Sequence, residues 1–542
     1  MKASKVCLIN PPTTDPSERS VYFPMALLTL GGVLKAKGVA AELWDFDLYF
    51  KKAGNISEKD FRKLLKSGVK GAGTAVFGIS SICSNFPMAL YIAKLIKEFE
   101  PGSLIIFGGP QPSSIPGEIL ERFPFVDCVV AGEGERTLAE MVECGFRLDA
   151  FREVPGLWYR DDGRIQSNAK RALVENMDDL PFPDYALVNI WDYAEFQGGG
   201  YSPCIEVGRG CPFHCTFCST SLMWEKDFRV KSPARIFQEM KRLNETFGFA
   251  SFDFIHDNFT TSRKFVTDFC EYLENHSEPQ YTWTASSRTD CIDVKRLQRM
   301  YRVGLRGLFF GIETGSARMQ AVIKKNLNFE NFEPILQEGN RIGMSSTTAF
   351  IMGFPEEGEE DLDQTFLRAL HYKRVGTNRV FFSKLAALTG TGLYREFVGR
   401  MKEVSHTSTI NPQNYGIPYI CGLIERYPDL FSSFFHVPHP KFSSDYLVKF
   451  VEFSNLAVNG SPRLVAQVLD ILRLSPTRLF HEWNGWSESR GKSYWNYRVY
   501  SVEDFRADFQ SFLDERYFSR IKHPESVRPF EILPSKASRA VA

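Results

Sequence analysis

The sequence predicts an α/β protein with an N-terminal doubly wound, Rossmann-like domain, then a partial (β/α)6 barrel, then a mainly α-helical C-terminal region. Short apolar runs alternate with amphipathic helices in two successive stretches of the chain, which favours parallel sheets covered by helices. Polar or glycine-rich loops follow several of the expected strands. With 542 residues, the chain exceeds what one hydrophobic core usually serves, so we expect several domains.

The first expected domain spans residues 1–145. Its strands are expected at 5–9, 40–44, 75–80, 104–107 and 128–131, and its clearest helices at 25–37 and 89–99. Four loops follow these strands, namely Asn10-Pro11-Pro12, Ser80-Ser81, Gly108-Gly109-Pro110 and Gly132-Glu133-Gly134-Glu135. A turn explains any one of these glycines. Four such loops favour a ligand crevice, because open parallel sheets bind ligands at the carboxyl ends of their strands.

Residues 146–196 are polar and interrupted, as in a small hairpin and a linker. The second domain is expected over 197–395. Its strands are expected at 204–207, 251–256, 281–286, 307–312, 347–352 and 379–382, and its helices at 233–247, 262–275 and 294–303. This span is too short for the eight units of a complete barrel, so a partial barrel of about six units fits best.

Residues 396–542 are expected to form a C-terminal substrate-binding or lid domain with a helix at 464–474. This region is rich in aromatic residues, among them Phe431, Phe434, Phe435, Trp483, Trp486, Tyr494, Trp495 and Tyr497. Packing within a core or lid is the simpler interpretation. A surface that lines the substrate is the alternative.

Composition excludes several classes of protein. Hydrophobic residues make up 43% and charged residues 24% of the chain, which is typical of folded globular proteins. Its 65 basic residues balance 65 acidic ones, so no overall charge attracts nucleic acid or an anionic membrane. No apolar run approaches the roughly 20 residues that span a bilayer, and no signal-peptide pattern opens the chain. We therefore expect a cytoplasmic protein without a nucleic-acid partner or a membrane span.

Eleven cysteines are present, and eight of them are scattered, as small buried residues are in a reducing compartment. The other three, Cys211, Cys215 and Cys218, form a C-x3-C-x2-C motif directly after the first strand of the second domain. Three thiolates can bind three irons of a [4Fe-4S] cluster and leave the fourth iron open to a small molecule. Zinc is the alternative, but a structural zinc site needs a fourth ligand, such as His214 or a distant residue.

This motif, placed after the first strand of a partial barrel, resembles the signature of radical S-adenosylmethionine (SAM) enzymes. Four later segments resemble the strand ends of that family in the same order: Ile255-His256-Asp257-Asn258-Phe259, Ser286-Ser287-Arg288-Thr289-Asp290, Gly311-Ile312-Glu313-Thr314-Gly315 and Ile351-Met352-Gly353-Phe354-Pro355. The resemblance implies that the three cysteines hold a [4Fe-4S] cluster and that SAM chelates the open iron. It also implies that one electron cleaves SAM to methionine and a 5′-deoxyadenosyl radical.

The first domain resembles the cobalamin-binding domain that precedes the barrel in class B radical SAM methyltransferases. The segments that carry this likeness are Phe23-Pro24-Met25-Ala26-Leu27-Leu28, Gly108-Gly109-Pro110-Gln111 and Gly132-Glu133-Gly134-Glu135, and the whole resemblance covers about residues 5 to 395. It implies cobalamin contacts at Pro11, Pro12, Ser80, Ser81, Asn85, Gly108, Gly109, Gln111, Gly132, Glu133 and Gly134.

One departure concerns the cobalt ligand. The chain has no D-x-H-x-x-G motif, and Gln111 stands where relatives often have a histidine. Binding of cobalamin without an axial histidine and persistence of the fold without cobalamin both stay open.

The resemblance also assigns SAM contacts. Phe217 is expected to pack against the adenine, Arg288 to bind the carboxylate and Glu313 to bind the amino or ribose groups. Asp257, Asn258 and Ser287 complete the expected set. The structural alternatives are a core position for Phe217, an ion pair between Arg288 and Glu313, and helix capping by Asp257 and Asn258. No catalytic residue beyond the cluster ligands is predicted.

Three functions are compatible with these patterns. The leading one is a cobalamin-dependent radical SAM enzyme that C-methylates an unactivated carbon of a small-molecule or peptide natural-product precursor and takes its electron from a reductant such as flavodoxin or ferredoxin. The second is a radical SAM enzyme of the same architecture that catalyses cyclisation or rearrangement, with or without cobalamin. The third is a non-catalytic metal-binding protein.

Overall fold

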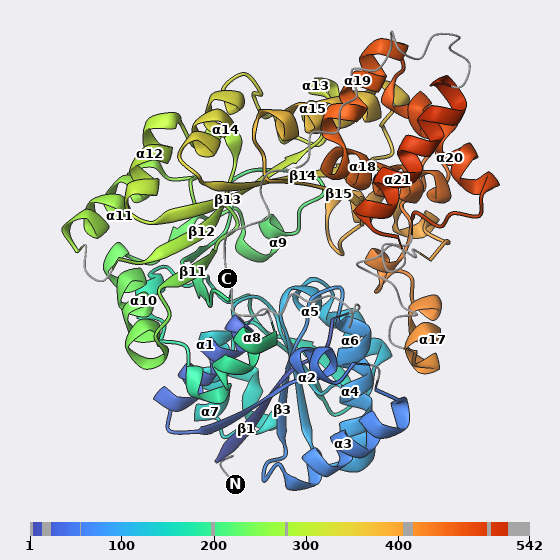
Figure 1. Cartoon of the computed structure of the whole chain (residues 1–542). Coiled ribbons are helices and arrows are strands. Elements are labelled where there is room, and N and C mark those ends of the chain that lie inside the picture. The colour runs from blue at the N-terminus through green and yellow to red at the C-terminus, as the bar shows by residue number, and fades with distance from the viewer. Residues whose placement is uncertain are drawn as a thin grey trace.

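The computed structural model describes residues 4–13, 23–54, 56–196, 201–276, 280–404, 416–495 and 500–518. A seven-stranded sheet with its helices forms the N-terminal part, a six-stranded parallel sheet forms the middle part, and helices follow at the C-terminus (Figure 1). The predicted α/β fold class is confirmed.

The first sheet consists of β1 (Lys5–Asn10), β2 (Ala40–Asp45), β3 (Val76–Ser80), β4 (Leu104–Gly108), β5 (Cys128–Val130), β6 (Leu157–Asp161) and β7 (Arg164–Ser167). Their order is β2-β1-β3-β4-β5-β6-β7. The first five strands are parallel, whereas β6 and β7 are antiparallel to their neighbours. The hairpin that the sequence predicts near the linker therefore extends the first sheet, because β6 pairs with the open edge of β5.

Helices cover both faces of this sheet: α1 (Met25–Ala36) and α7 (Gly134–Glu143) on one, and α2 (Phe46–Ala53), α3 (Glu58–Gly71), α4 (Phe86–Phe99) and α6 (Pro116–Arg122) on the other. Alternate residues of β1 show why. Val6 and Leu8 are buried with α1 and α7, and Cys7 and Ile9 are buried with the other helices. The strand order reverses between β1 and β3, which is where such sheets form their ligand crevice.

The second sheet runs in the order β15-β14-β13-β12-β11-β8, and every neighbouring pair is parallel. Its strands are β8 (Cys204–Glu206), β11 (Ser251–Ile255), β12 (Thr282–Ser287), β13 (Leu305–Glu313), β14 (Ser345–Met352) and β15 (Arg379–Lys384). Its helices are α10 (Pro233–Phe247), α11 (Arg263–Asn275), α12 (Val294–Arg302), α13 (Ala317–Val322), α14 (Phe332–Arg341) and α15 (Glu359–Val375), and α8 (Ile190–Phe196) precedes it. The predicted partial barrel of six strands is confirmed.

The open edge of β15 is covered by α18 (Ser444–Gly460). Asn455 accepts a hydrogen bond from the Phe382 N–H and donates one to the Phe382 carbonyl, both at 2.9 Å. Asn459 does the same for Val380, at 3.0 and 2.7 Å. Residues four apart on a helix rise about 6 Å, close to the roughly 6.7 Å between residues two apart on a strand. Two asparagine side chains thus take the place of a further strand.

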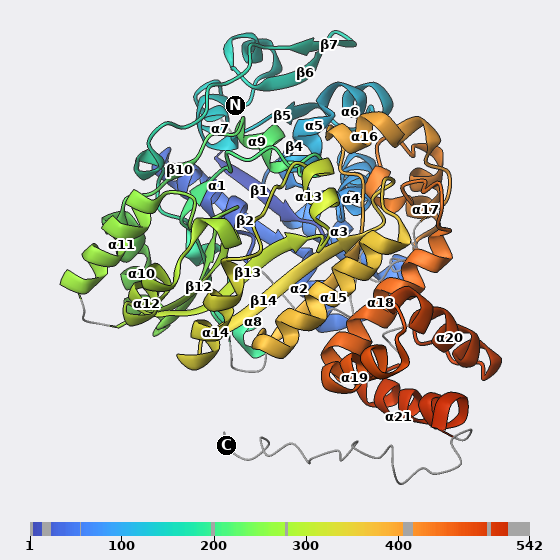
Figure 2. The ribbon, with the colours of Figure 1, turned by 90° about the horizontal axis from the view of Figure 1, so that it is seen from above.

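The described parts of the chain after β15 pack in two places. Residues 385–404 and 416–437, with α16 (Gly392–Phe397) and α17 (Pro418–Arg426), join the core beside α4 and α6 of the first domain. The helices α18, α19 (Pro462–Leu472), α20 (Pro476–Ser489) and α21 (Val502–Leu513) gather at the β15 end of the second sheet (Figure 2).

The aromatic residues singled out in the C-terminal region mostly form core. Phe431, Phe434, Phe435, Trp483 and Tyr494 are buried, and Trp486 and Trp495 pack against the same cores. Tyr497 lies outside the described residues. The core-packing interpretation therefore fits the described members of this set.

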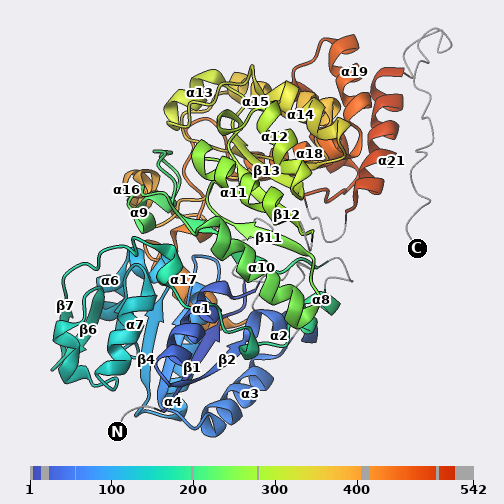
Figure 3. The same ribbon diagram turned by 90° about the vertical axis from the view of Figure 1, so that its left-hand side faces the viewer.

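The carboxyl ends of the two sheets face each other, with α9 (Thr220–Trp224) and α16 between them (Figure 3). The loops at these ends enclose the cavities described below. Within the described part of the chain, we find no helix that combines the length and the apolar character required to cross a bilayer.

Candidate active site

The three motif cysteines lie on the loop between two short antiparallel strands, β9 (Gly208–Arg209) and β10 (Arg229–Val230). Gly210 opens this loop at φ +90°, and a Cβ there would lie 1.6 Å from the Asp227 carbonyl oxygen. Only glycine therefore fits.

Two backbone hydrogen bonds tie the cysteine loop to the barrel. The Gly210 N–H donates to Asp257 at 2.9 Å, at the end of β11. The Thr216 N–H, between the second and third cysteines, donates to the Ile323 carbonyl at 3.1 Å, after α13. The strand ends thus set the path of the loop.

Cys211, Cys215 and Cys218 are half-buried and form no disulfide. Among the described residues, no three histidine, cysteine or acidic side chains are arranged around a single metal ion. In a cubane cluster each thiolate binds a different iron, so the three sulfurs need not meet at one point. Three unpaired thiols on one glycine-initiated loop are the donor set that a [4Fe-4S] cluster requires.

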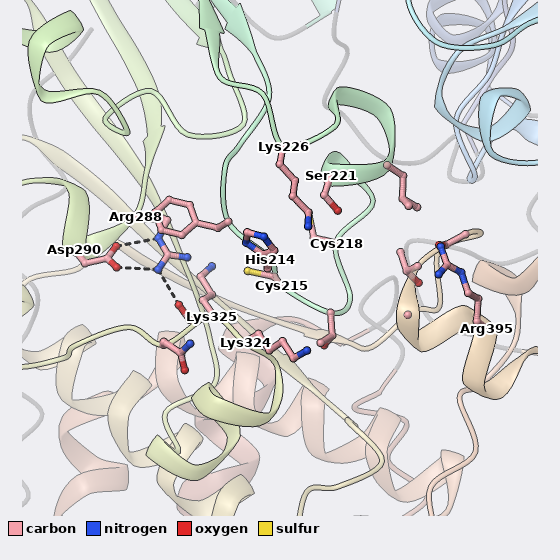
Figure 4. A pocket seen from close by; sticks show the side chains of 17 residues that line it. His214, Cys215, Cys218, Ser221, Lys226, Arg288, Asp290, Lys324, Lys325 and Arg395 are labelled. Atoms are coloured by element: carbon pink, nitrogen blue, oxygen red, sulfur yellow. Dashed lines mark hydrogen bonds and ion pairs between the residues drawn. The ribbon is translucent and has the colours of Figure 1, made fainter. Parts of the chain in front are cut away.

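A cavity of about 910 Å³ opens beside this loop, and Cys215 and Cys218 line it together with Phe213, Arg288, Lys325 and Arg395 (Figure 4). Burial raises the pKa of the Cys211 thiol to about 11. Burial also raises the pKa of Cys215, while the charges of Lys325 and Arg288 lower it. Those two cations favour the thiolate form, which is the form that binds metal.

Arg288 and Glu313 do not pair with each other. Arg288 makes a bidentate ion pair with Asp290 at 2.9 and 2.8 Å, and its guanidinium lies 3.6 Å from the centre of the Phe213 ring. Glu313, at φ +67°, instead accepts a bond from Lys325 at 2.5 Å. Arg288 lines the cavity, whereas Glu313 reaches it only through Lys325.

The other residues expected to contact SAM support the loops. Asn258 is buried, and its side-chain oxygen accepts a bond from the Arg288 N–H at 3.1 Å. Ser287 shares a hydrogen bond of 2.6 Å with Thr260. Asp257 holds Gly210 and also Thr220 at 2.9 Å, and burial raises its pKa.

Two aromatic residues of the motif have different surroundings. Phe217 packs against Phe354, with ring centres 5.7 Å apart, and borders a hydrophobic core rather than the cavity. Phe213 lines the cavity, although sequence reasoning did not select it. Its position inside the cysteine motif could have indicated that it lines the site. Lys325 also lines the cavity, but it lies after α13 in a segment without a recognisable motif.

A second cavity, of about 680 Å³, lies between the two sheets. Its wall includes Gln111, Gly132 and Glu133 from the first domain and Leu222, Asp257 and Thr389 from the rest of the chain. A third cavity, of about 220 Å³, continues from it into the first domain, between α1, α7 and the sheet, and is lined by Ser80, Gly108, Gly109 and Gly134 among others.

Glycines shape these two cavities. Gly109, at φ +98°, lies against β3, where a Cβ would approach the Ser81 carbonyl to 2.6 Å. Gly132, at φ +89°, has nothing within 4 Å of the position a Cβ would take, so its surface is open to a ligand. An extended cofactor that fills a crevice and a deeper apolar cleft fits this arrangement, as cobalamin would.

Four of the expected cobalamin contacts do not line either cavity: Pro11, Pro12, Ser81 and Asn85. Asn85 donates to the Pro11 carbonyl at 3.3 Å and accepts from Ser81 at 3.0 Å. These residues therefore shape the loops behind the crevice. Gln111 lines the crevice, but its amide donates to the Leu430 carbonyl at 2.8 Å and accepts from Thr389 at 2.9 Å.

Glu133 and Glu135 of the first domain form a buried ion cluster with the second domain. Glu133 accepts bonds from Arg209 at 2.8 Å and from Arg229 at 2.9 Å, and Glu135 accepts one from Arg209 at 2.6 Å. Glu206 also binds Arg209, at 2.8 Å. The Glu133 side chain is only 2% exposed, and both arginines are 6% exposed. The Gly132-Glu133-Gly134-Glu135 segment, which leads into α7, thus joins the two domains in addition to lining the crevice.

Comparison with known proteins gives two family matches in chain order. The model of the B12 binding domain matches residues 19–142, and that of the radical SAM superfamily matches residues 205–369. Together they cover more than half of the chain.

Individual relatives agree with these matches. An uncharacterized methyltransferase, PH0819, of Pyrococcus horikoshii is 28% identical over 397 residues, which is 73% of this chain and 83% of that protein. The anaerobic magnesium-protoporphyrin IX monomethyl ester cyclase of Cereibacter sphaeroides is 28% identical over 292 residues, covering 52% of this chain and 47% of the cyclase.

Among solved structures, the radical SAM methyltransferase TsrM from Kitasatospora setae, with cobalamin and a [4Fe-4S] cluster bound, has the same fold. The two align with a TM-score of 0.63 at 15% identity, over 84% of this chain and 89% of TsrM. With a B12-binding domain ahead of a radical SAM domain, which together imply cobalamin, a [4Fe-4S] cluster and SAM as cofactors, this chain is a cobalamin-dependent radical SAM enzyme.

Proposed function

We propose that this enzyme transfers a methyl group to an unactivated carbon of a small-molecule or peptide natural-product precursor. The observation that carries the proposal is that the cavity beside the cysteines adjoins the cavity between the sheets. Leu222 is part of both walls, and consecutive residues of two segments, 219–222 and 388–392, separate the two spaces. A substrate held near Leu222 would lie within reach of both.

The chemistry belongs to the cofactors. When bound, the cluster and SAM supply a 5′-deoxyadenosyl radical, cobalamin supplies the methyl group, and a reductant such as flavodoxin or ferredoxin provides electrons. We assign Cys211, Cys215 and Cys218 to the cluster. Arg288, held by Asp290 and stacked on Phe213, faces the cavity and is the proposed partner of the SAM carboxylate.

The remaining residues position these groups. Glu313 holds the Lys325 ammonium in the wall of the cavity, and Asn258 fixes the Arg288 backbone. On the cobalamin side, Gly109 and Gly132 allow a ligand close to the backbone, and Gln111 binds the segment that closes the crevice. No axial protein ligand to cobalt is part of the proposal.

A ring-forming reaction is the second candidate. It is favoured by the similarity to the cyclase relative. That cyclase and the methyltransferase PH0819 are both 28% identical to this chain, although the cyclase matches over a shorter stretch. Both reactions begin with abstraction of a hydrogen atom from substrate, so the fate of the SAM methyl group separates them.

The test uses anaerobically reconstituted protein incubated with a reductant, a cell extract and SAM that is either unlabelled or deuterated in its methyl group. We expect a product whose mass differs by three units between the two reactions, and we expect Cys215→Ala to abolish it. Cys421→Ala, at a half-buried cysteine of α17 outside the motif, serves as the matched control. Formation of 5′-deoxyadenosine with an unlabelled product would favour cyclisation and overturn the methylation proposal.

A further inference from the structure

The rim of the cavity beside the cysteines carries three cations from three separate segments: Lys226 after α9, Lys324 after α13, and Arg395 on α16. We propose that these three side chains bind an acidic group of the substrate, a phosphonate, phosphate or carboxylate. This inference rests on the proposed function, since it concerns the substrate of the same site.

The charge of the cavity wall is unbalanced. Five lysines and arginines line it together with a single carboxylate, that of Asp290. Asp290 is taken by Arg288, and Lys325 is taken by Glu313. Within the described ranges, the side chains of Lys226 and Lys324 form no hydrogen bond or ion pair, and the guanidinium of Arg395 donates only to the Gly390 carbonyl, at 3.0 Å. Three positive charges at the rim therefore have no acidic partner in the described chain.

Both lysines stand where a short helix ends. Lys226 has φ +64° and follows Glu225 at φ +54° after α9, and Lys324 has φ +55° after α13. A left-handed residue commonly ends a helix, so these turns are ordinary helix ends. They place both lysines on the wall of the cavity.

The rim cations are held next to the cysteine loop. Lys324 follows Ile323, whose carbonyl accepts the bond from Thr216. Arg395 belongs to α16, which begins at Gly392, and Gly392 itself lines the same cavity. Figure 4 shows Arg395 on the side of the cavity opposite Arg288. An acidic group bound near Arg395 would thus lie across the cavity from Arg288, the proposed partner of the SAM carboxylate.

Two other roles for these cations fit less well. Arg288 and Lys325 line the same cavity as Cys215 and are each held by an ion pair, so the cluster and SAM already have cations of their own. Docking of an acidic electron carrier would use a broad surface, whereas a concave space of about 910 Å³ has the size of a small-molecule site.

The test measures binding without turnover. Phenylphosphonate and benzoate are titrated calorimetrically into the reconstituted holoenzyme saturated with SAM. We expect at least one of the two acids to bind saturably, and the comparison distinguishes a phosphonate or phosphate from a carboxylate. Each of Lys226→Met, Lys324→Met and Arg395→Met should weaken binding about fivefold, as expected of partly screened ion pairs. Lys324→Arg should stay within about twofold of the parent because it keeps the charge.

Lys295→Met, on an exposed face of α12, is the matched control and should leave binding unchanged. The inference is overturned if neither acid binds the parent, or if the three variants bind the acids as well as the parent does. It is also overturned if the variants lose affinity for SAM instead, or if they lose only the rate of cluster reduction by flavodoxin. Because no methyl transfer is measured, failure of the methylation proposal would leave these results interpretable.

Discussion

Substitution Glu133→Gln tests the buried ion cluster that joins the two domains. Glutamine keeps the size of the side chain but removes its negative charge. Arg229 then loses its main acidic partner, and Arg209 loses one of several. Arg209 retains Glu135 and Glu206, at 2.6 and 2.8 Å. Among the residues that the structure describes, Arg229 keeps only Asp227 as an ion-pair partner, at 3.2 Å, and the Asp227 side chain is 54% exposed. Arg229 is thus the cation that the substitution leaves poorly compensated.

The expected cost follows from this asymmetry. Removing one partner of a buried ion pair costs about 3–5 kcal/mol, and the lower figure applies because only one of the two arginines loses its main partner. A loss of about 3 kcal/mol raises the population of the opened interface more than about 100-fold. Hydrogen exchange of residues 204–231, measured on the unreconstituted protein, should report this opening directly.

Glu274→Gln is the matched control, because Glu274 makes a similar bidentate pair with Arg299, at 2.9 and 2.7 Å, on an exposed surface. Its expected cost is below about 1 kcal/mol. The double variant Glu133→Gln, Arg229→Met should recover part of the stability, because it removes the stranded charge. If Glu133→Gln accelerates exchange no more than Glu274→Gln does, the cluster does not hold the interface and the reasoning fails.

Three further changes test other parts of the structure. Asn455→Leu removes the two hydrogen bonds to the Phe382 backbone at the edge of β15 and should lower the free energy of unfolding by about 2 kcal/mol, measured by urea denaturation. An unchanged denaturation midpoint would mean that these bonds do not stabilise the edge. Burial raises the pKa of Glu357 to about 8, so its contribution to stability should be full below about pH 4.5 and be lost as the pH rises toward 8. Glu357→Gln should flatten this dependence of the free energy of unfolding on pH. A variant whose stability curve runs parallel to that of the parent would contradict the prediction. Gly210→Ala forces a strained φ that costs about 1–3 kcal/mol besides its clash, so iron content after reconstitution should fall while far-ultraviolet circular dichroism stays the same.

The strands of both sheets could be predicted from the sequence because the signal is local. In β1, every residue from Val6 to Ile9 is apolar and buried, and the strand ends at Asn10, just before two prolines. The cysteine motif was equally local. Contacts between distant segments were out of reach: the partners of Glu133 lie 76 and 96 residues further along the chain. The residues around Glu133 in the sequence do not indicate that this segment also joins the two domains.

The same limit explains the edge of the barrel and the site contacts. The Asn455 and Asn459 side chains lie 73 and 79 residues beyond the strand residues that they bind, and helix residues four apart have many other uses. Arg288 could be selected because it ends a strand, but its stacking on Phe213 depends on how the cysteine loop folds back. Position along the chain thus suggests candidate site residues, but it does not indicate which side chains they contact.

The position of the interdomain ion cluster links the fold to the proposed chemistry. Arg209 directly precedes Gly210, and Arg229 begins β10, so the two arginines stand at the two ends of the cysteine loop. Glu133 binds both of them from the rim of the crevice in the first domain. The loop between contributes few residues to the hydrophobic cores, so apolar packing alone would place it poorly. One buried carboxylate at the crevice thus anchors both ends of the cysteine loop, and the proposed transfer of a methyl group between the two cavities requires such an alignment.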